Sequence, residues 1–375
     1  MKWEKVKLGN VTDSCLGKML DQNKNKGDYQ PYLANVNVRW GEFDLEDLPL
    51  MKFEESEQER YELKYGDLVI CEGGEPGRCA IWKEQIPNMK IQKALHRVRV
   101  HDCLDYRYLF YWFLLAGKTG ELDQYFTGAT IKHMPGQKLK EVVIDKPPLE
   151  IQHRIADILS AYDDLIENNQ KQIKLLEEAA QRLYKEWFVD LRFPGHENTK
   201  IVDGVPEGWS RGLLKELISV NYGKDHKKAP DDGNIPIYGS GGLMRKCNKS
   251  LFSGEAVLIP RKGSLNNIMY VDETFWTVDT MFYATMKQPH TAVFVYFFVK
   301  AFDMYSMNIG AAVPSMTTKI LDAMDVVIPD KETLEKFDKY AKVYFNKIKT
   351  LQGQNERLKT ARDLLLPKLM SGEAV

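Results

Sequence analysis

The chain has 375 residues, 43% of them hydrophobic and 28% charged, with a formal net charge of −1 at pH 7. This length predicts two or three domains with ample core material, and the near-neutral charge argues mildly against a nucleic-acid binder, whose domains are often basic. The first ten residues are too polar for a signal peptide, and no apolar run reaches the roughly 20 residues that span a membrane.

The cysteine and histidine patterns argue against metal and disulfide chemistry. The five cysteines are scattered and form no CxxC pair, so we expect neither disulfides nor zinc, and a cytoplasmic location. The seven histidines lack HExxH spacing, GSGG at 239–242 is not a GxGxxG loop, and no Walker A or GxSxG motif occurs. We therefore expect a chain that carries no catalysis and binds no cofactor or metal of its own.

Residues 1–148 are predicted to form an α+β globule. Short β-branched runs at 66–70, 80–82 and 96–100 are separated by Gly/Pro turns, of which GGEPG at 73–77 is one. The aromatic run YLFYWFLLA (108–116) predicts a buried helix, and VVIDKPP (142–148) predicts a final strand.

Residues 149–190 are predicted to form the first of two long helices. Apolar side chains recur three or four residues apart from Ile151 to Trp187, in a heptad seam with one stutter after Tyr162. About 39 residues at 1.5 Å rise give a rod of roughly 58 Å. A rod of this length with one apolar stripe needs a partner helix.

The partner helix is predicted at the C-terminus, in residues 329–375. The two seams align with Ile151 on Phe337 and Asn169 on Asn355. An Asn in each seam would fix the register at a cost in stability, while a solvated Asn beside the seam is an equal alternative. The residues expected in the seam or against partner subunits are Ile158, Tyr162, Asn169, Leu176, Tyr344, Ile348, Leu351, Asn355 and Leu358.

The chain is predicted to be an internal duplication. Residues 191–208 form a linker, and residues 209–328 form a second globule that repeats motifs of the first in the same order. GDLVI (66–70) recurs as GEAVLI (254–259), and GATIKHMPGQKLKEVVI (128–144) recurs as GAAVPSMTTKILDAMDVVI (310–328). We therefore expect a pseudo-twofold α+β molecule, with two similar globules separated by an antiparallel pair of long helices.

The chain resembles the specificity subunits of type I restriction–modification systems over nearly its whole length. The strongest motifs are the helix from PPLEIQHRIADIL to QRLYKEWF (147–188), VDGVPEGW (202–209) and RDLLLPKLMSG (362–372). YLANVNV (32–38), GDLVICEGGEPGRCAIW (66–82) and IPIYGSGGLM (235–244) are similar to that family's recognition domains. The resemblance implies two target-recognition domains that bind double-stranded DNA, two methyltransferase subunits docked on the chain, and motor–nuclease subunits in the full complex.

Candidate DNA contacts are polar and basic residues near glycine-containing turns, because base edges need hydrogen-bonding side chains and phosphates need cations or backbone N–H groups. In the first globule the candidates are Asn35, Asn37, Arg39, Arg78, Lys90, Lys93, Lys132 and His133. In the second they are Lys224, Lys227, Tyr238, Ser240, Arg245, Arg261, Lys262, Asn266 and Asn267.

The family resemblance and the residue patterns together leave two function classes. The first is a DNA-reading specificity subunit, in which each globule reads half of an asymmetric bipartite site and the helices set the gap. The alternative is a coiled-coil scaffold whose globules bind proteins, which the near-neutral charge favours. The missing motifs argue against a nuclease or methyltransferase in its own right.

Overall fold

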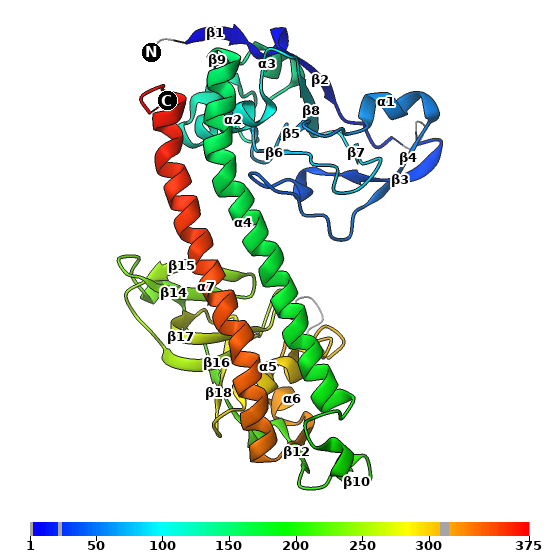
Figure 1. Ribbon diagram of the computed structural model, residues 1–375, viewed down its shortest axis with the longest axis vertical. Helices are drawn as coiled ribbons and strands as arrows, with labels where there is room; N and C mark the ends of the chain where they lie inside the picture. Colours follow the sequence, from blue (N-terminus) through cyan, green and yellow to red (C-terminus); the bar gives the residue numbers. More distant parts are fainter. Residues whose placement is uncertain (1–2, 22–24, 308–314, 375) are drawn as a thin grey trace. The chain divides into compact units, whose positions relative to one another are not determined.

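The computed structural model describes residues 3–21, 25–307 and 315–374 and has an α+β fold (Figure 1). The chain divides into two compact units, Met1–Asn168 with Gln354–Val375, and Asn169–Gly353. Each unit contains one globule and part of each of two long helices, α4 (Leu149–Tyr184) and α7 (Lys331–Met370). The predicted α+β class with two repeated domains and two long helices is confirmed.

The first globule is built on an antiparallel sheet of strand order β2-β8-β5-β6. Its strands are β2 (Thr12–Leu16), β5 (Leu68–Cys71), β6 (Cys79–Ile81) and β8 (Leu95–Val100). All four residues of β5 are buried, as the β-branched GDLVI run predicts. Two smaller sheets join β1 (Glu4–Lys7) to β9 (Val143–Lys146), and β3 (Asp28–Leu33) to β4 (Leu50–Phe53) and β7 (Lys90–Ile91).

Three helices accompany these sheets: α1 (Gln58–Tyr61), α2 (Tyr106–Thr119) and α3 (Gly136–Glu141). The N-cap of α2 is Asp105, whose carboxylate accepts from the backbone N–H groups of Arg107 and Tyr108. Gly120 ends α2 in the left-handed conformation, with φ of 75°. Most of α2 is buried, which agrees with its aromatic sequence.

The second globule repeats this topology. Its main sheet has the order β13-β18-β16-β17, continued by β14 and β15. These strands are β13 (Ile218–Tyr222), β14 (Ile235–Gly239), β15 (Gly242–Cys247), β16 (Phe252–Pro260), β17 (Met269–Thr277) and β18 (Met281–Met286). β16 and β17 pair antiparallel on either side of the RKGSL segment (261–265), which connects them as a hairpin.

The remaining elements of the second globule also have counterparts in the first. β12 (Ser210–Leu213) pairs with β19 (Asp325–Ile328) as β1 pairs with β9. Helices α5 (Ala292–Lys300) and α6 (Thr318–Asp322) occupy the places of α2 and α3 in chain order. The linker carries a small hairpin of β10 (Ile201–Val202) and β11 (Val205–Pro206).

Within each unit, α4 and α7 pack against each other in opposite directions (Figure 1). In the first unit, Ile155 and Leu159 near the start of α4 share a core with Leu366 and Leu369 near the end of α7. In the second unit the ring centroid of Trp187, just beyond α4, lies 5.8 Å from that of Phe337 near the start of α7. These contacts confirm the predicted antiparallel pairing.

The predicted seam residues are buried or half-buried along both helices. Leu165 is 53% exposed while Ile166 is 6% exposed, so the seam continues through Ile166 after the stutter. Asn169 and Asn355 are 8% and 6% exposed, and the alternative of a solvated Asn beside the seam is therefore wrong for both. Among the described residues, no helix is long and apolar enough to cross a lipid bilayer.

Candidate nucleic-acid interface

In both globules, the turn after the central strand is hydrogen-bonded to the loop before the small helix. In the first globule, Met134 N donates to Glu72 O at 2.7 Å, and Gly73 forms a β-bridge with His133. In the second, Met316 N donates to Arg261 O at 2.9 Å, and Lys262 forms a β-bridge with Ser315. These residues occupy matching places in the repeat. Of the predicted GAAVPS segment (310–315), residues 310–314 lie outside the described residues.

A third segment, residues 34–41, completes this surface in the first globule. Trp40 Nε1 donates to Glu75 Oε1 at 2.7 Å, and Arg78 Nη2 donates to Asn35 O at 3.1 Å. Gly41 N donates to Cys79 O at 3.0 Å. The structure therefore brings together three of the segments that the sequence singled out separately. Sequence reasoning missed Glu75 and the half-buried Trp40, although Glu75 lies within the GGEPG turn and Trp40 directly follows the candidate Arg39.

The predicted candidates of the first globule divide by exposure. Arg39, Lys93, Lys132 and His133 are exposed. Arg39 Nη1 donates to Val36 O, and Lys132 pairs with Asp123 at 3.4 Å, which holds both side chains near the loops that carry them. These four remain predicted DNA contacts.

Two of the first globule's candidates are corrected by their burial. Lys90 is fully buried and its Nζ lies 2.6 Å from Glu62 Oε2. Asn37 is 6% exposed; its Oδ1 accepts from Ala34 N at 2.9 Å and its Nδ2 donates to Asp44 O at 3.1 Å. Neither side chain is presented to a duplex, because the protein interior already satisfies its polar groups.

The second globule brings the Gly239–Gly242 turn against the turn that follows β16. Asn267 Nδ2 donates to Ser240 O at 2.9 Å, which joins the two turns. Arg261 lies on the same turn, with its guanidinium carbon 5.5 Å from the ring centroid of Tyr222. Lys224, Lys227 and Lys262 are exposed, and within the described residues none of them has an ion-pair partner. They remain predicted phosphate contacts.

Three candidates of the second globule hold its loops in place. Arg245 Nη2 donates to His226 O at 2.7 Å and Ala229 O at 2.9 Å, and Nη1 pairs with Asp231. Asn266 is exposed, yet its Nδ2 donates to Asp303 Oδ1 at 3.0 Å and its Oδ1 accepts from Met304 N at 2.8 Å. Tyr238 donates to Glu273 Oε1 at 2.5 Å. Internal partners therefore use the main polar groups of all three.

Burial favours the neutral form of two titratable groups near the first globule's turn, His96 and Cys71. Burial lowers the pKa of His96, whose Nε2 lies 2.9 Å from Met134 O, directly under the loop. Burial raises the pKa of Cys71 to about 11 against the opposing effect of Arg78, so its thiol stays protonated at neutral pH. In the described part of the chain, no group of three or more His, Cys, Asp or Glu side chains could hold a metal ion.

Comparison with known proteins supports the division of the chain into two repeats. The family model described as "Type I restriction modification DNA specificity domain" matches residues 1–178 and again residues 206–360. The two matched stretches correspond to the two repeats of globule and helix. Together they cover most of the chain.

Individual relatives align over most of their own length. The type I restriction enzyme MjaIX specificity subunit of Methanocaldococcus jannaschii is 27% identical over 349 residues, covering 82% of this chain and 77% of that protein. The MjaVIII specificity subunit of the same organism is 23% identical over 411 residues, covering 99% and 92%. The fold is similar to the crystal structure of a type I restriction–modification S subunit from M. genitalium, with a TM-score of 0.60, 19% identity and coverage of 98% and 96%. The chain therefore belongs to the family of type I restriction–modification specificity subunits.

Proposed function

We propose that each globule reads one half of an asymmetric bipartite DNA site and that the chain itself carries no catalysis. The observation that supports this most is the repeated connection between turn and loop, because the same backbone hydrogen bonds recur while the side chains differ. Gly73 and His133 stand in one globule where Lys262 and Ser315 stand in the other. Two surfaces of equal geometry and unequal chemistry are what two different half-sites require.

The exposed lysines of both globules support the phosphate contacts that such reading needs. Lys93 in the first globule and Lys224, Lys227 and Lys262 in the second lie on loops beside the turns. Phosphate contacts fix the register of a protein on the duplex, and base-edge contacts then select the sequence. The two long helices would set the gap between half-sites.

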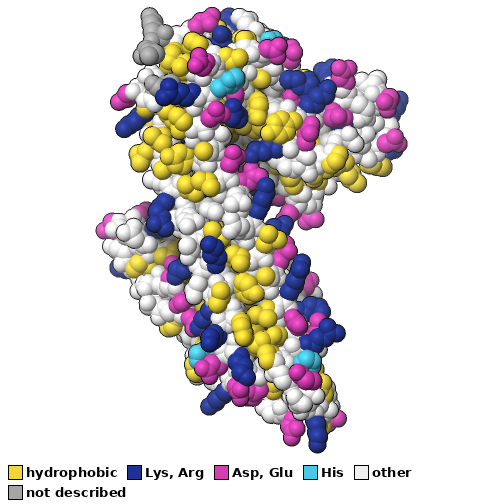
Figure 2. Space-filling model, viewed as in Figure 1, with side chains coloured by type: hydrophobic (Ala, Val, Ile, Leu, Met, Phe, Trp, Pro, Cys, Tyr) yellow, Lys and Arg dark blue, Asp and Glu magenta, His cyan; other side chains and the backbone are white. Residues whose placement is uncertain are grey.

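We also place the docking of two methyltransferase subunits on the helices, with motor–nuclease subunits joining the full complex. In the second unit, Leu175, Val189, Tyr340 and Val343 are each more than half exposed. Figure 2 shows hydrophobic side chains gathered over these helices, with Lys and Arg side chains beside them. An apolar patch with a charged rim is typical of a surface that another protein covers.

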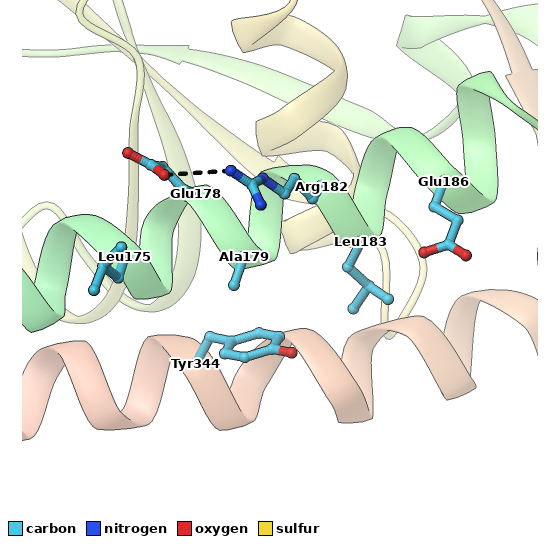
Figure 3. Close-up of a pocket in the computed structure, with 7 residues that line it drawn as sticks. All are labelled: Leu175, Glu178, Ala179, Arg182, Leu183, Glu186 and Tyr344. Carbon is cyan, nitrogen blue, oxygen red and sulfur yellow. Dashed lines mark ion pairs between the residues drawn. The ribbon is translucent and has the colours of Figure 1, made fainter.

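Two hollows beside α4 make this docking surface concave. In the first, of about 310 Å³, Leu175, Ala179 and Leu183 point from α4 toward Tyr344 of α7, and Arg182 pairs with Glu178 at its rim (Figure 3). The second, of about 530 Å³, is lined by the aromatic residues Tyr184 and Phe297 and by Lys300. Hollows with aromatic walls suit the large apolar side chains that anchor protein interfaces.

A domain exchange tests the proposed function. Residues 209–328 are replaced by the corresponding residues of another specificity subunit, and the methylated sequences in host DNA are mapped with the methyltransferase subunits present. We expect one half-site to change and the other to stay. Changes in both half-sites would contradict modular reading, and a wild-type complex without sequence preference on any duplex library would favour the protein-binding scaffold.

A further inference from the structure

Two asparagines in the short helical turn Asn35–Asn37 have opposite environments. Asn37 is buried and both ends of its amide are bonded inside the loop. Asn35 is partly exposed, and within the described residues its Nδ2 has no hydrogen-bond partner. Its Oδ1 accepts one long bond, from Arg78 Nη2 at 3.5 Å. Asn35 is therefore the asparagine of this turn with an amide available to a ligand.

Arg78 fixes the direction in which the Asn35 amide points. Its side chain is 16% exposed, with Nη1 3.0 Å from Glu75 Oε2 and Nη2 donating to Asn35 O at 3.1 Å. A guanidinium carries only donors, so it favours the carbonyl end of the amide on its own side. The Nδ2 donor is then directed away from Arg78. Glu75 in turn holds the guanidinium, and its other oxygen accepts from Trp40 Nε1.

The backbone that carries Asn35 is held by packing as well as by hydrogen bonds. The Trp40 ring lies against Gly117 of α2, where an added Cβ would stand 2.7 Å from two ring carbons. Gly117 thus makes room for the ring that fastens residues 34–41 to the globule. A side chain presented from a fixed loop loses little conformational entropy on binding.

Two glycines, Gly73 and Gly74, lie next to the side chains of His133 and Asn35. An added Cβ on Gly74 would stand 2.7 Å from Asn35 Nδ2, and one on Gly73 would stand 2.8 Å from His133 Nδ1. Gly74 also has a φ of 76°, which disfavours other residues. The two glycines leave room for the Asn35 amide and the exposed His133 ring to lie against the turn, where Gly74 is exposed beside Asn35.

We propose that Asn35 reads an adenine in the first globule's half-site and that Arg78 is the positioning residue that orients it. This inference rests on the proposed function. The amide presents one donor and one free acceptor lone pair in a plane, which matches N7 and the N6 amino group of adenine in the major groove. A bidentate contact of this kind discriminates against other bases by about 10- to 100-fold.

The test uses the complete complex with its methyltransferase subunits and compares Asn35→Ala, Arg78→Gln and Arg39→Ala with wild type. Methylated sequences are mapped in host DNA, and binding is measured on duplexes that carry 7-deazaadenine at each adenine of the first half-site. We expect Asn35→Ala to relax one adenine position and to lose about 10- to 100-fold in affinity for the wild-type site. The wild type should respond to 7-deazaadenine at that position and Asn35→Ala should not.

Arg78→Gln should relax the same position, because the amide loses its orientation, while Arg39→Ala weakens all duplexes alike. Arg78→Lys should restore part of the discrimination, since an ammonium group reaches either Asn35 or Glu75. An Asn35→Ala complex that weakens equally on every sequence, or that keeps the wild-type motif, overturns the inference. Absence of any sequence preference in the wild type would instead overturn the proposed function, so the two failures are distinguishable.

Discussion

Replacing Arg362 tests the polar contact between the two long helices in the first unit. Arg362 fills a seam slot between Leu358 and Leu365, and its side chain is 16% exposed. Its Nη1 donates to Asp163 of α4, and Nε and Nη2 donate to Asp363 at 3.1 and 2.9 Å. Arg362→Met keeps the seam apolar and removes only the guanidinium.

The expected loss follows from burial. Breaking a fully buried ion pair costs about 3–5 kcal/mol, whereas an exposed pair contributes about 0–1 kcal/mol. Asp163 is 28% exposed and keeps one bond, from Tyr111 Oη at 2.6 Å. Asp363 keeps its ion pair with Lys118, whose Nζ lies 2.5 Å from Asp363 Oδ2. We therefore expect Arg362→Met to destabilise the α4–α7 contact by about 2 kcal/mol, between those two limits.

A double-mutant cycle with Asp163→Asn isolates the pair. The neutral amide of Asp163→Asn can still accept from Tyr111 Oη. In the double variant, no half-buried carboxylate at residue 163 is then left without the Arg362 guanidinium. We expect a coupling energy of about 1–1.5 kcal/mol. Because a chain of two units need not unfold in one step, the measurement is hydrogen exchange of the amides in 355–370. A coupling energy under about 0.3 kcal/mol would refute the reasoning.

Three further predictions address the interface and its support. Lys262→Ala should lower the slope of log affinity against log salt by about 0.9, the effect of one lost phosphate contact. Lys90→Met is the matched control: because the Lys90 ammonium is buried, its removal should leave this slope unchanged and should appear instead as lost stability in urea unfolding. Burial lowers the pKa of His96, so below about pH 6.5 the unfolded chain binds a proton that the folded chain does not bind. The free energy of unfolding should therefore fall from pH 7.5 to 5.5 by up to about 1.4 kcal/mol per pH unit, measured by urea titration. His96→Gln should flatten this pH dependence, and equal pH dependence in the variant and the wild type would contradict the assignment. Trp187→Ala should lower the stability of the second unit by about 3–5 kcal/mol, measured as faster amide hydrogen exchange in the first turns of α7. A loss of stability under about 1 kcal/mol would show that the contact of Trp187 with Phe337 is dispensable.

Periodicity predicted the helices well because their seam depends on residue spacing alone. The three- and four-residue steps placed Ile158, Leu176, Ile348 and Leu351 in the seam without any knowledge of tertiary structure. The π-helical turn Lys185–Val189 at the end of α4 was not predicted. Aromatic contacts of Trp187 and Phe188 with Phe337 accompany that turn, and they depend on residues distant in sequence.

The burial of the candidate side chains could not be predicted from the loops that carry them. Residue type selected Lys90 and Lys262 equally, yet Lys90 is fully buried and Lys262 is exposed. The difference arises from Glu62, a residue distant in sequence that satisfies the Lys90 ammonium. A lysine's place inside or outside therefore depends on a tertiary partner, which local sequence does not reveal.

Under the proposed function, the connection between turn and loop would let one fold present two different recognition surfaces. The bonds from Met134 to Glu72 and from Met316 to Arg261 join backbone atoms, so their geometry does not depend on the side chains at those positions. Residues beside the bonds, such as His133 and Ser315, can then differ without a change in loop path. A specificity change should consequently need substitutions at side chains flanking these bonds, and substitutions that remove a backbone donor, such as Met134→Pro, should abolish recognition whatever the target sequence.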